Sequence, residues 1–421
     1  MININNKVNT NTFWIMFGRM FQIILTFITT MLITRYLGPL NYGKITYAFS
    51  YVSLFIPIGQ LGLNDIIIKQ LINKRAKNNE ILGTIIVLRT ASSFFSVLLI
   101  YILFKNIIGS TELLHVAFLQ SISLIFQTYE CIIYFYQSKL LAKKVGIIYA
   151  IAYISTSLFR IICLVLNRNI YWFAFCTSLD YIVIAILLLF TYFKDGNKLI
   201  FSKQMVKELL FQSRPYLFSG ILTVIAGKAD SILLGNLIDE ETVGYYNSAI
   251  TLCNAWPFVL SAIIDSSSPI IISLYDSDRA AYRKRIRQLY AVIFYISLIV
   301  ALIFTVFSNQ IITFIYGNNY LKASVPLKIA CWSTVFSYFG VARFIWMQCE
   351  NKHYLERRIT LFGLIFNLIM NFILIRSFGI IGAAITLTVT QFFMNFILLF
   401  FFKETRQNAI QIMYAIILKD V

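Results

Sequence analysis

Twelve apolar runs, each close to the length of a bilayer crossing, constrain this chain more than any other feature of its sequence. A helix needs about 20 predominantly apolar residues to span the hydrocarbon core of a membrane. The runs alternate with short polar segments and contain few charges, so each is predicted to be one transmembrane helix. Their approximate spans are residues 11–34, 44–66, 81–104, 113–137, 145–166, 171–193, 213–238, 244–273, 289–312, 325–348, 359–376 and 380–402.

The composition agrees with a chain that lies mostly in lipid. Hydrophobic residues make up 59% and charged residues 13% of the 421 residues, whereas soluble domains contain about 25% charged residues. Met1 to Thr12 are mostly polar, and the first run is too long for the apolar core of a signal peptide. We therefore expect that run to remain as a membrane helix. The predicted fold class is an all-α polytopic membrane protein without a separate soluble domain.

The 36 Lys and Arg residues are distributed unevenly among the segments that flank the runs. With the N-terminus in the cytoplasm, 24 of them fall in cytoplasmic segments or run ends, 7 on the opposite side and 5 deep inside runs. Because cytoplasmic loops of membrane proteins carry an excess of Lys and Arg, both termini are predicted to be cytoplasmic. No basic stripe alternates with exposed aromatic residues, so the net charge of +18 does not predict nucleic-acid binding.

The longest segment between two runs, residues 194–212, divides the runs into two sets of six. We predict an N-terminal lobe at 1–193, a cytoplasmic inter-lobe loop at 194–212, a C-terminal lobe at 213–402, and an amphipathic cytoplasmic tail at 403–421 on the inner membrane face. Residues 37–50 can be aligned with 238–251, which places Gly43 opposite Gly244, as expected of repeated halves. Chance similarity between hydrophobic segments is the alternative explanation.

Nine ionisable residues lie well inside the runs, where each charge costs about 2.5–3.5 kcal/mol to insert. Several of them share a helix face with other polar residues, as Glu130 does with Gln120 and Gln127. We expect these faces together to line a hydrated central cavity, whereas each single face is equally well explained as a helix-packing surface. The nine residues are the cations Arg19, Arg89, Arg160, Lys228 and Arg343 and the acids Glu130, Asp180, Asp230 and Asp265.

The excess of cations over acids among these nine residues predicts an anionic substrate. The planar guanidinium group of Arg donates paired hydrogen bonds to phosphate and keeps its charge. The acids would either pair with the cations or carry coupling ions such as protons. Lys228 and Asp230 are two positions apart on one helix, so they are expected to point in different directions.

Sequence motifs of enzymes are missing. Neither Gly43-Lys44 nor Gly227-Lys228 has the additional glycine and the Ser or Thr of a phosphate-binding P-loop, and no G-x-S-x-G motif occurs. His115 and His353 are the only histidines, and the six cysteines do not have the spacing of a metal site. We therefore expect no catalytic residue, no metal and no cofactor.

Five short motifs, by their order and spacing, resemble those of the bacterial polysaccharide (O-antigen) flippases, relatives of the multidrug and toxin extrusion exporters. This resemblance implies two six-helix lobes around a cationic cavity lined by Arg19, Arg89, Arg160, Lys228, Asp230 and Arg343. The motifs are R-Y-L-G-P at 35–39 with Tyr42-Gly43, Lys228-Ala229-Asp230, V-G-Y-Y at 243–246, Tyr316-Gly317 with Tyr320, and F-G-I-I-G-A-A at 378–384.

The function implied by this resemblance is the translocation of undecaprenyl-pyrophosphate-linked oligosaccharides from the cytoplasmic to the periplasmic leaflet of the bacterial inner membrane. These oligosaccharides would be O-antigen units for lipopolysaccharide biosynthesis, and the partners would be membrane lipid, an O-antigen polymerase and a chain-length regulator. The alternatives are a cation-coupled multidrug exporter of the same fold, for which an excess of acids is expected, and a membrane-embedded O-antigen polymerase, for which a large outer loop is expected.

Overall fold

The structure is a computed structural model that describes residues 2–73, 77–352 and 354–419, with the side chains of 2–13, 15–17, 19 and 107 excepted. All regular structure in these residues is helical. Eleven helical stretches in this described part are long and apolar enough to cross a membrane. The chain is thus a multi-pass membrane protein, and the predicted all-α fold class is confirmed.

The count of eleven differs from the twelve predicted runs because one helical stretch, Met20–Asn73, takes in parts of the first two runs. Helix α1 (Ile2–Leu54) is interrupted at Gly38, whose φ of 71° and ψ of 170° are not helical. Pro39 follows directly, and a proline at the start of a new helical segment needs no backbone N–H there. Two membrane helices therefore meet at Gly38, which lies between the first two predicted runs.

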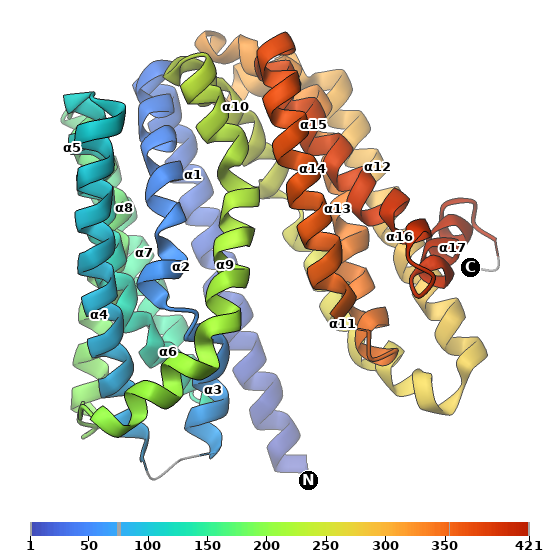
Figure 1. Cartoon of the computed structure of the whole chain (residues 1–421), viewed down its shortest axis with the longest axis horizontal. Coiled ribbons are helices and arrows are strands. Elements are labelled where there is room, and N and C mark those ends of the chain that lie inside the picture. Colours follow the sequence, from blue (N-terminus) through green and yellow to red (C-terminus); the bar gives the residue numbers. More distant parts are fainter. Residues whose placement is uncertain (1, 74–76, 353, 420–421) are drawn as a thin grey trace. The chain divides into compact units, whose positions relative to one another are not determined.

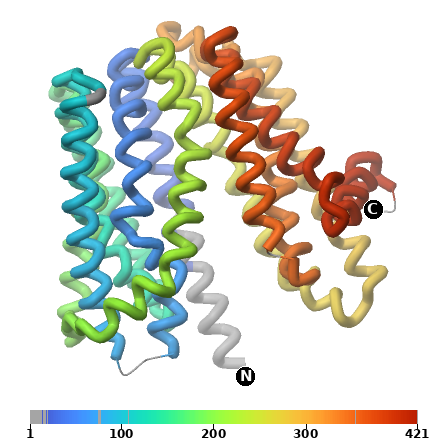
Figure 2. Tube along the Cα trace, in the orientation of Figure 1, coloured from blue at the N-terminus to red at the C-terminus, as the bar shows by residue number. Residues whose placement is uncertain are grey.

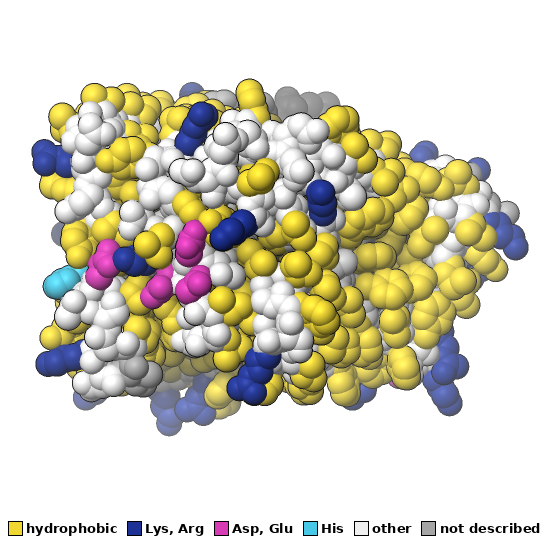
Figure 3. All heavy atoms as spheres, turned by 90° about the horizontal axis from the view of Figure 1, so that it is seen from above, with side chains coloured by type: hydrophobic (Ala, Val, Ile, Leu, Met, Phe, Trp, Pro, Cys, Tyr) yellow, Lys and Arg dark blue, Asp and Glu magenta, His cyan; other side chains and the backbone are white. Residues whose placement is uncertain are grey.

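Large apolar side chains cover the outside of the protein, as a lipid environment requires. Phe314 is 83% exposed, Val165 73% and Phe401 72%. In the space-filling view of Figure 3, hydrophobic side chains cover much of the face shown, and Lys and Arg side chains are scattered among them. Exposed apolar area on this scale is not found on soluble monomers.

The chain divides into two compact units, and the chain passes between them three times. Unit 1 combines Met1–Leu37 with Lys44–Lys228, and unit 2 combines Gly38–Gly43 with Ala229–Val421. These units differ from the predicted lobes at two places. Residues 203–228 of α9 join unit 1, and the corner at 38–43 joins unit 2. The segment expected to be an inter-lobe loop, 194–212, is helical from Lys203 onward.

In unit 1, α5 packs against both α4 and α8, and α7 packs on the other side of α8 (Figure 1). Ser110 caps α5 by accepting a hydrogen bond from the backbone N–H of Leu113. Besides α1, the helices of this unit are α2 (Ile56–Gln60), α3 (Asn64–Asn73), α4 (Asn78–Leu103), α5 (Thr111–Gln127), α6 (Cys131–Ser138), α7 (Ala142–Val165), α8 (Ile170–Lys194) and most of α9 (Lys203–Leu237), with η2 (Phe104–Ile108) and η3 (Thr128–Glu130) as short irregular turns.

Asp195, directly after α8, ties together three helices at one end of unit 1. The ammonium group of Lys144 on α7 lies 2.6 Å from the Asp195 carboxylate, and the hydroxyl of Tyr136 on α6 donates to the same carboxylate at 2.8 Å. The hydrogen bond from Lys144 lowers the pKa of Asp195. The end of α8 is therefore fixed by a charged contact.

In unit 2, α13 has a central position, with α10, α11, α12 and α15 packed around it (Figure 1). Asp278 caps α12 by accepting from the backbone N–H groups of Ala280 and Ala281. The helices are α10 (Glu240–Ala255), α11 (Phe258–Ser277), α12 (Arg279–Tyr316), η4 (Asn318–Ala323), α13 (Ser324–Cys349), α14 (Tyr354–Phe378), α15 (Ile380–Phe392), η5 (Phe393–Ile397), α16 (Leu398–Phe401) and α17 (Arg406–Ile416).

The C-terminal helix α17, which lies in the tail expected on the membrane face, packs against α12. The amide of Asn408 donates to the hydroxyl of Tyr290 at 2.8 Å, and both side chains are buried. The hydroxyl of Tyr295 donates to the backbone oxygen of Ile416 at 2.9 Å. The opposite face of α17 leaves Ile410 and Met413 exposed, so the helix is amphipathic with one face on protein.

Helix α9 belongs to both units, because the boundary between them falls inside it, between Lys228 and Ala229. Figure 2 shows that the trace of this helix changes direction along its length. The helix contains Pro215, and a proline inside a helix removes a backbone hydrogen bond and bends the axis. The part that follows is continuous through Gly227, so Lys228 and Asp230 lie on regular helix.

Two glycines allow the corner at 38–43 to approach the first turns of α10 within unit 2. A Cβ atom added to Gly244 would overlap the carbonyl oxygen of Pro39, and one added to Gly43 would overlap the carbonyl oxygen of Glu240. The two backbones thus touch at a place where no side chain fits. The sequence alignment had paired these same two glycines as equivalent positions of the two halves.

This contact predicts that Gly244→Ala destabilises the protein by about 1–3 kcal/mol, because the two backbones must separate to admit the methyl group. A lower unfolding temperature of the detergent-solubilised protein would show the loss. Gly227→Ala is the matched control, since a Cβ there meets nothing within 4 Å and alanine favours helix over glycine. An unchanged unfolding temperature for Gly244→Ala would contradict the tight contact.

Candidate functional site

Lys228 is a cation inside a membrane helix whose described contact is with an aromatic ring. It lies on α9 within unit 1 and is partly exposed. Its ammonium group is 5.6 Å from the centre of the Phe49 ring. Among the described residues no carboxylate lies within ion-pair distance of Lys228. An ammonium group at membrane depth that faces only an aromatic ring is available to an anionic ligand.

Asp230, two residues further along α9, is held in a buried polar network of unit 2. The hydroxyl of Tyr246 donates to its carboxylate at 2.7 Å, and the amide of Asn371 donates at 2.5 Å. Asn371 also donates to Asn367 at 3.0 Å. Asp230 is 6% exposed, and two donors to its oxygens offset part of the cost of burying the charge. The prediction that Lys228 and Asp230 point in different directions is confirmed by these contacts.

Arg160 forms a buried ion pair with another of the predicted site residues. One of its nitrogens lies 2.5 Å from the carboxylate of Asp180, and both side chains are nearly inaccessible. Arg160 lies on α7 and Asp180 on the neighbouring α8, so the pair connects two packed helices of unit 1. The sequence placed both residues inside runs without pairing them.

Two further arginines are also engaged within their own units. Arg89 is fully buried in unit 1, and its guanidinium donates to the side-chain oxygen of Asn64. Arg343 is 1% exposed in unit 2 and lies 3.3 Å from the carboxylate of Glu356. Asn64 and Glu356 were absent from the predicted site because they belong to the polar ends of helices. The side chain of Arg19, on α1, lies outside the described residues.

Glu130 faces a small cavity in unit 1. It is the last residue of the 3₁₀ turn η3, which interrupts the helical path between α5 and α6. The cavity has a volume of about 150 Å³, and Trp14, Tyr134, Gln137 and Tyr149 also line it. Amide and phenol side chains can donate hydrogen bonds to an ionised carboxylate and accept one from a protonated carboxyl group. Glu130 therefore has suitable neighbours in either protonation state.

Asp265 lines a larger cavity in unit 2, which we call the α11–α13 cavity. Its volume is about 590 Å³, which is within the range of small-molecule sites. Amides, hydroxyls and carboxylates converge on it from four helices. The polar lining residues are Asp265, Ser268, Ser337, Gln348, Glu356, Gln391 and Asn395.

One wall of the α11–α13 cavity is a π-helical turn, η5, which places Asn395 and Met394 in two glycine notches. A Cβ at Gly340 would overlap the side-chain oxygen of Asn395, and a Cβ at Gly363 would overlap the sulfur of Met394. Asn395 also donates to Gln391 at 3.0 Å. Single π-helical turns are frequent at functional sites, so this cavity is a built feature of unit 2.

Sequence reasoning missed most residues of this cavity. Gln391 and Asn395 lie in the last apolar run and are four positions apart, so they share one face of the helix. That spacing is a signal that could have been found. The glycines that admit Asn395 and Met394 gave no signal, since a notch is visible only when the facing helix is in place.

The Arg160–Asp180 pair predicts that Asp180→Asn destabilises the protein by about 3–5 kcal/mol, because a buried guanidinium would lose its counter-charge. Thermal unfolding of the purified protein measures this loss. The double variant Arg160→Met, Asp180→Leu removes both charges and is expected to unfold close to the native temperature. Equal unfolding temperatures for native protein and Asp180→Asn would show that the pair contributes nothing.

Comparison with known proteins assigns residues 8–275 to the family described as "Polysaccharide biosynthesis protein". The capsular polysaccharide biosynthesis protein CapF of Staphylococcus aureus is 22% identical over 390 residues, which cover 90% of this chain and 95% of CapF. The probable flippase AglR of Haloferax volcanii is 30% identical over 159 residues, which cover 37% of this chain and 33% of AglR.

Among solved structures, the lipid II flippase MurJ in an inward closed conformation has a similar fold. The TM-score is 0.72 at 16% sequence identity, and the match covers 96% of this chain and 92% of MurJ. At this identity the likeness concerns the fold. It shows that the helices described above are arranged as in a known polytopic membrane protein.

Proposed function

Because the chain belongs to the polysaccharide biosynthesis protein family, we propose that it is a flippase that moves lipid-linked oligosaccharides across the membrane. The specific cargo we propose is an undecaprenyl-pyrophosphate-linked O-antigen unit, moved from the cytoplasmic to the periplasmic leaflet of a bacterial inner membrane. The similarity to CapF, to the probable flippase AglR and to the fold of MurJ supports a transporter of this kind rather than an enzyme.

The observation that carries this proposal is Lys228, a cation inside a membrane helix without a described counter-charge. A pyrophosphate group is the part of the proposed cargo that would neutralise it. Arg89, Arg160 and Arg343 already have partners within their units. We therefore assign these three arginines first to holding the helices together, and Lys228 to binding the head group.

The α11–α13 cavity supplies the chemistry for the sugar part of the cargo. Sugar hydroxyls both donate and accept hydrogen bonds, and the amides of Gln348, Gln391 and Asn395 do the same. The carboxylates of Asp265 and Glu356 disfavour a pyrophosphate at this place by charge repulsion. Head group and glycan would thus be recognised by different residues.

An acid is needed if a proton gradient drives the transport. Glu130 is suited to this because it lies in a membrane helix and borders a cavity. Asp230 is the second candidate, since Tyr246 and Asn371 hold its carboxylate. Asp180 is assigned to the ion pair with Arg160 rather than to coupling.

One observation favours the alternative of a multidrug exporter. The two carboxylates of the α11–α13 cavity would attract a cationic drug. The cation near this cavity, Arg343, is buried and paired with Glu356.

A strain that lacks the gene distinguishes the two functions. Loss of the flippase would trap complete lipid-linked repeat units at the inner leaflet and remove the surface polymer. Drug sensitivity with a normal surface polymer would instead support the exporter.

The assignment of Lys228 predicts that Lys228→Gln slows appearance of the surface polymer about tenfold or more, because a charge-assisted contact to the head group is lost. Lys228→Arg keeps the charge and is expected to retain part of the activity. The amount of trapped lipid-linked precursor in complemented deletion cells is the measurement.

Lys207→Gln, an equal charge change at an exposed position earlier on α9, is the control and is expected to act as the native protein. Native export by Lys228→Gln at a native expression level would remove Lys228 from the binding site. Equal losses for Lys207→Gln and Lys228→Gln would indicate a general effect of charge on insertion.

A further inference from the structure

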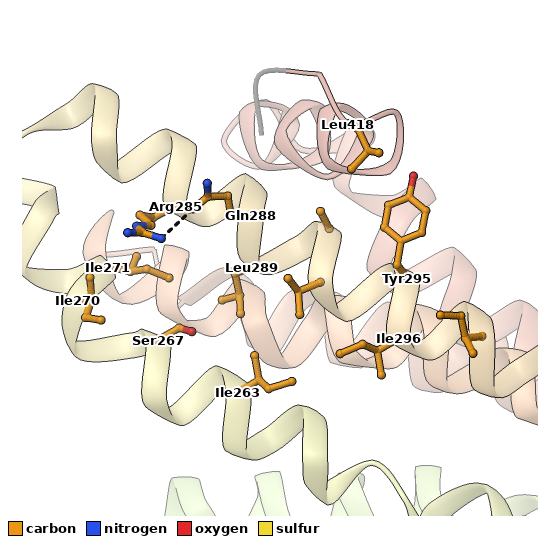
Figure 4. A pocket seen from close by; sticks show the side chains of 13 residues that line it. Ile263, Ser267, Ile270, Ile271, Arg285, Gln288, Leu289, Tyr295, Ile296 and Leu418 are labelled. Carbon is orange, nitrogen blue, oxygen red and sulfur yellow. Dashed lines mark hydrogen bonds between the residues drawn. The ribbon is translucent and has the colours of Figure 1, made fainter.

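A second large cavity of unit 2 lies between α11 and α12 and has a different chemistry. We call it the α11–α12 groove (Figure 4); its volume is about 740 Å³. Ile263, Ile270 and Ile271 of α11 line it together with Leu289, Ile296 and Ile299 of α12. Leu418, beyond α17, and Tyr295 lie together at one side of it in Figure 4. This lining suits a hydrocarbon chain.

One end of the groove is cationic. Arg285 and Gln288 line it there, and the guanidinium of Arg285 donates to the side-chain oxygen of Gln288 at 3.0 Å (Figure 4). No carboxylate among the described residues pairs with Arg285. An exposed guanidinium and an amide at the end of an apolar groove together provide donors for a phosphate group.

The surroundings of Arg285 are also basic. Arg279, Arg283, Lys284 and Arg287 belong to the same first turns of α12. Three acids lie near these basic residues, and two of them already have partners. Glu350 lies 3.7 Å from Arg279, and Asp278 caps the helix. The third, Asp276, is exposed. The local charge therefore favours an anion at this end of the groove.

The length of the groove corresponds to one leaflet. Arg285 and Ile299 are fourteen residues apart on α12, which at 1.5 Å per residue is roughly 21 Å. One leaflet is about 20–22 Å deep when its headgroup region is included, half of the total bilayer thickness. A single acyl chain with its phosphate at Arg285 thus fits the order of the lining residues along α12.

We propose that the α11–α12 groove is a binding site for an anionic membrane phospholipid. One acyl chain lies between α11 and α12, and the phosphate accepts hydrogen bonds from Arg285 and Gln288. The basic turns of α12 are predicted to lie on the cytoplasmic side, where anionic lipids attract Lys and Arg. The site is separate from the proposed transport function, because it needs no glycan.

The test is native mass spectrometry of the purified full-length protein with equal amounts of phosphatidylglycerol and phosphatidylcholine of matched chains. The native protein is expected to retain phosphatidylglycerol preferentially. Arg285→Gln should bind it about fivefold more weakly, as expected for the loss of one cation near a lipid head group. Lys284→Gln removes the same charge from the neighbouring position, which does not line the groove, and should bind as the native protein does.

Two variants fill the groove from opposite walls, Ser267→Phe on α11 and Val292→Phe on α12. Both residues line the groove, and Val292 is exposed, so its replacement leaves the packed interior intact. Each should release both lipids without changing the charge. Retention of lipid by a folded Val292→Phe protein would overturn the proposal.

Three other outcomes would also overturn it. Equal weakening by Lys284→Gln and Arg285→Gln would mean attraction to a charged surface only. Displacement of phosphatidylglycerol by a smaller amount of polyprenyl phosphate would assign the groove to the transported lipid. A dimer that Val292→Phe converts to a monomer would assign it to a second copy of the chain.

Discussion

The absence of water from the bilayer core is the constraint on which the structure depends. A buried charge there must find its partner within the protein, because solvent cannot supply one. Arg160 finds Asp180 on the next helix, Arg343 finds Glu356, and Asp230 receives hydrogen bonds from Tyr246 and Asn371. These contacts fix the register of neighbouring helices. They matter because apolar packing between helices in lipid is only weakly specific. Lys228 stands apart because its described contact is with an aromatic ring.

This distinction changes how intramembrane charges are interpreted in a protein of this kind. A charge with a polar partner on a neighbouring helix is assigned first to the stability of the fold. A charge without such a partner is a candidate for binding. By this criterion the four predicted cations whose side chains are described separate into three structural arginines and one candidate ligand-binding lysine. The acids separate into paired Asp180, the networked Asp230 and the cavity residues Glu130 and Asp265.

Apolar runs and the positions of glycine and proline were sufficient to predict the all-α polytopic fold, because the length of a bilayer crossing is visible in one sequence. The break at Gly38 falls between the first two predicted runs, where two helices had to be connected. The pairing of Arg89 with Asn64, 25 positions away, was not predictable, since it depends on how two helices are rotated about their axes. The α11–α13 cavity was missed because four helices form it, and its glycine notches exist only in the packed structure. Which side of the membrane each terminus occupies stays a prediction.

The corner at Gly38–Gly43 has a consequence for how the chain is made. Its packing partner, the start of α10, is encoded about 200 residues later. At a synthesis rate of 5–20 residues per second, the corner waits roughly 10–40 s for that partner to leave the ribosome. During this time the first two helices are already long enough to enter the membrane, yet their connecting backbone has nothing to pack against. Biogenesis of this protein therefore includes an interval in which an early part of the chain is inserted but not assembled, and the first half cannot complete its fold before the second half has begun.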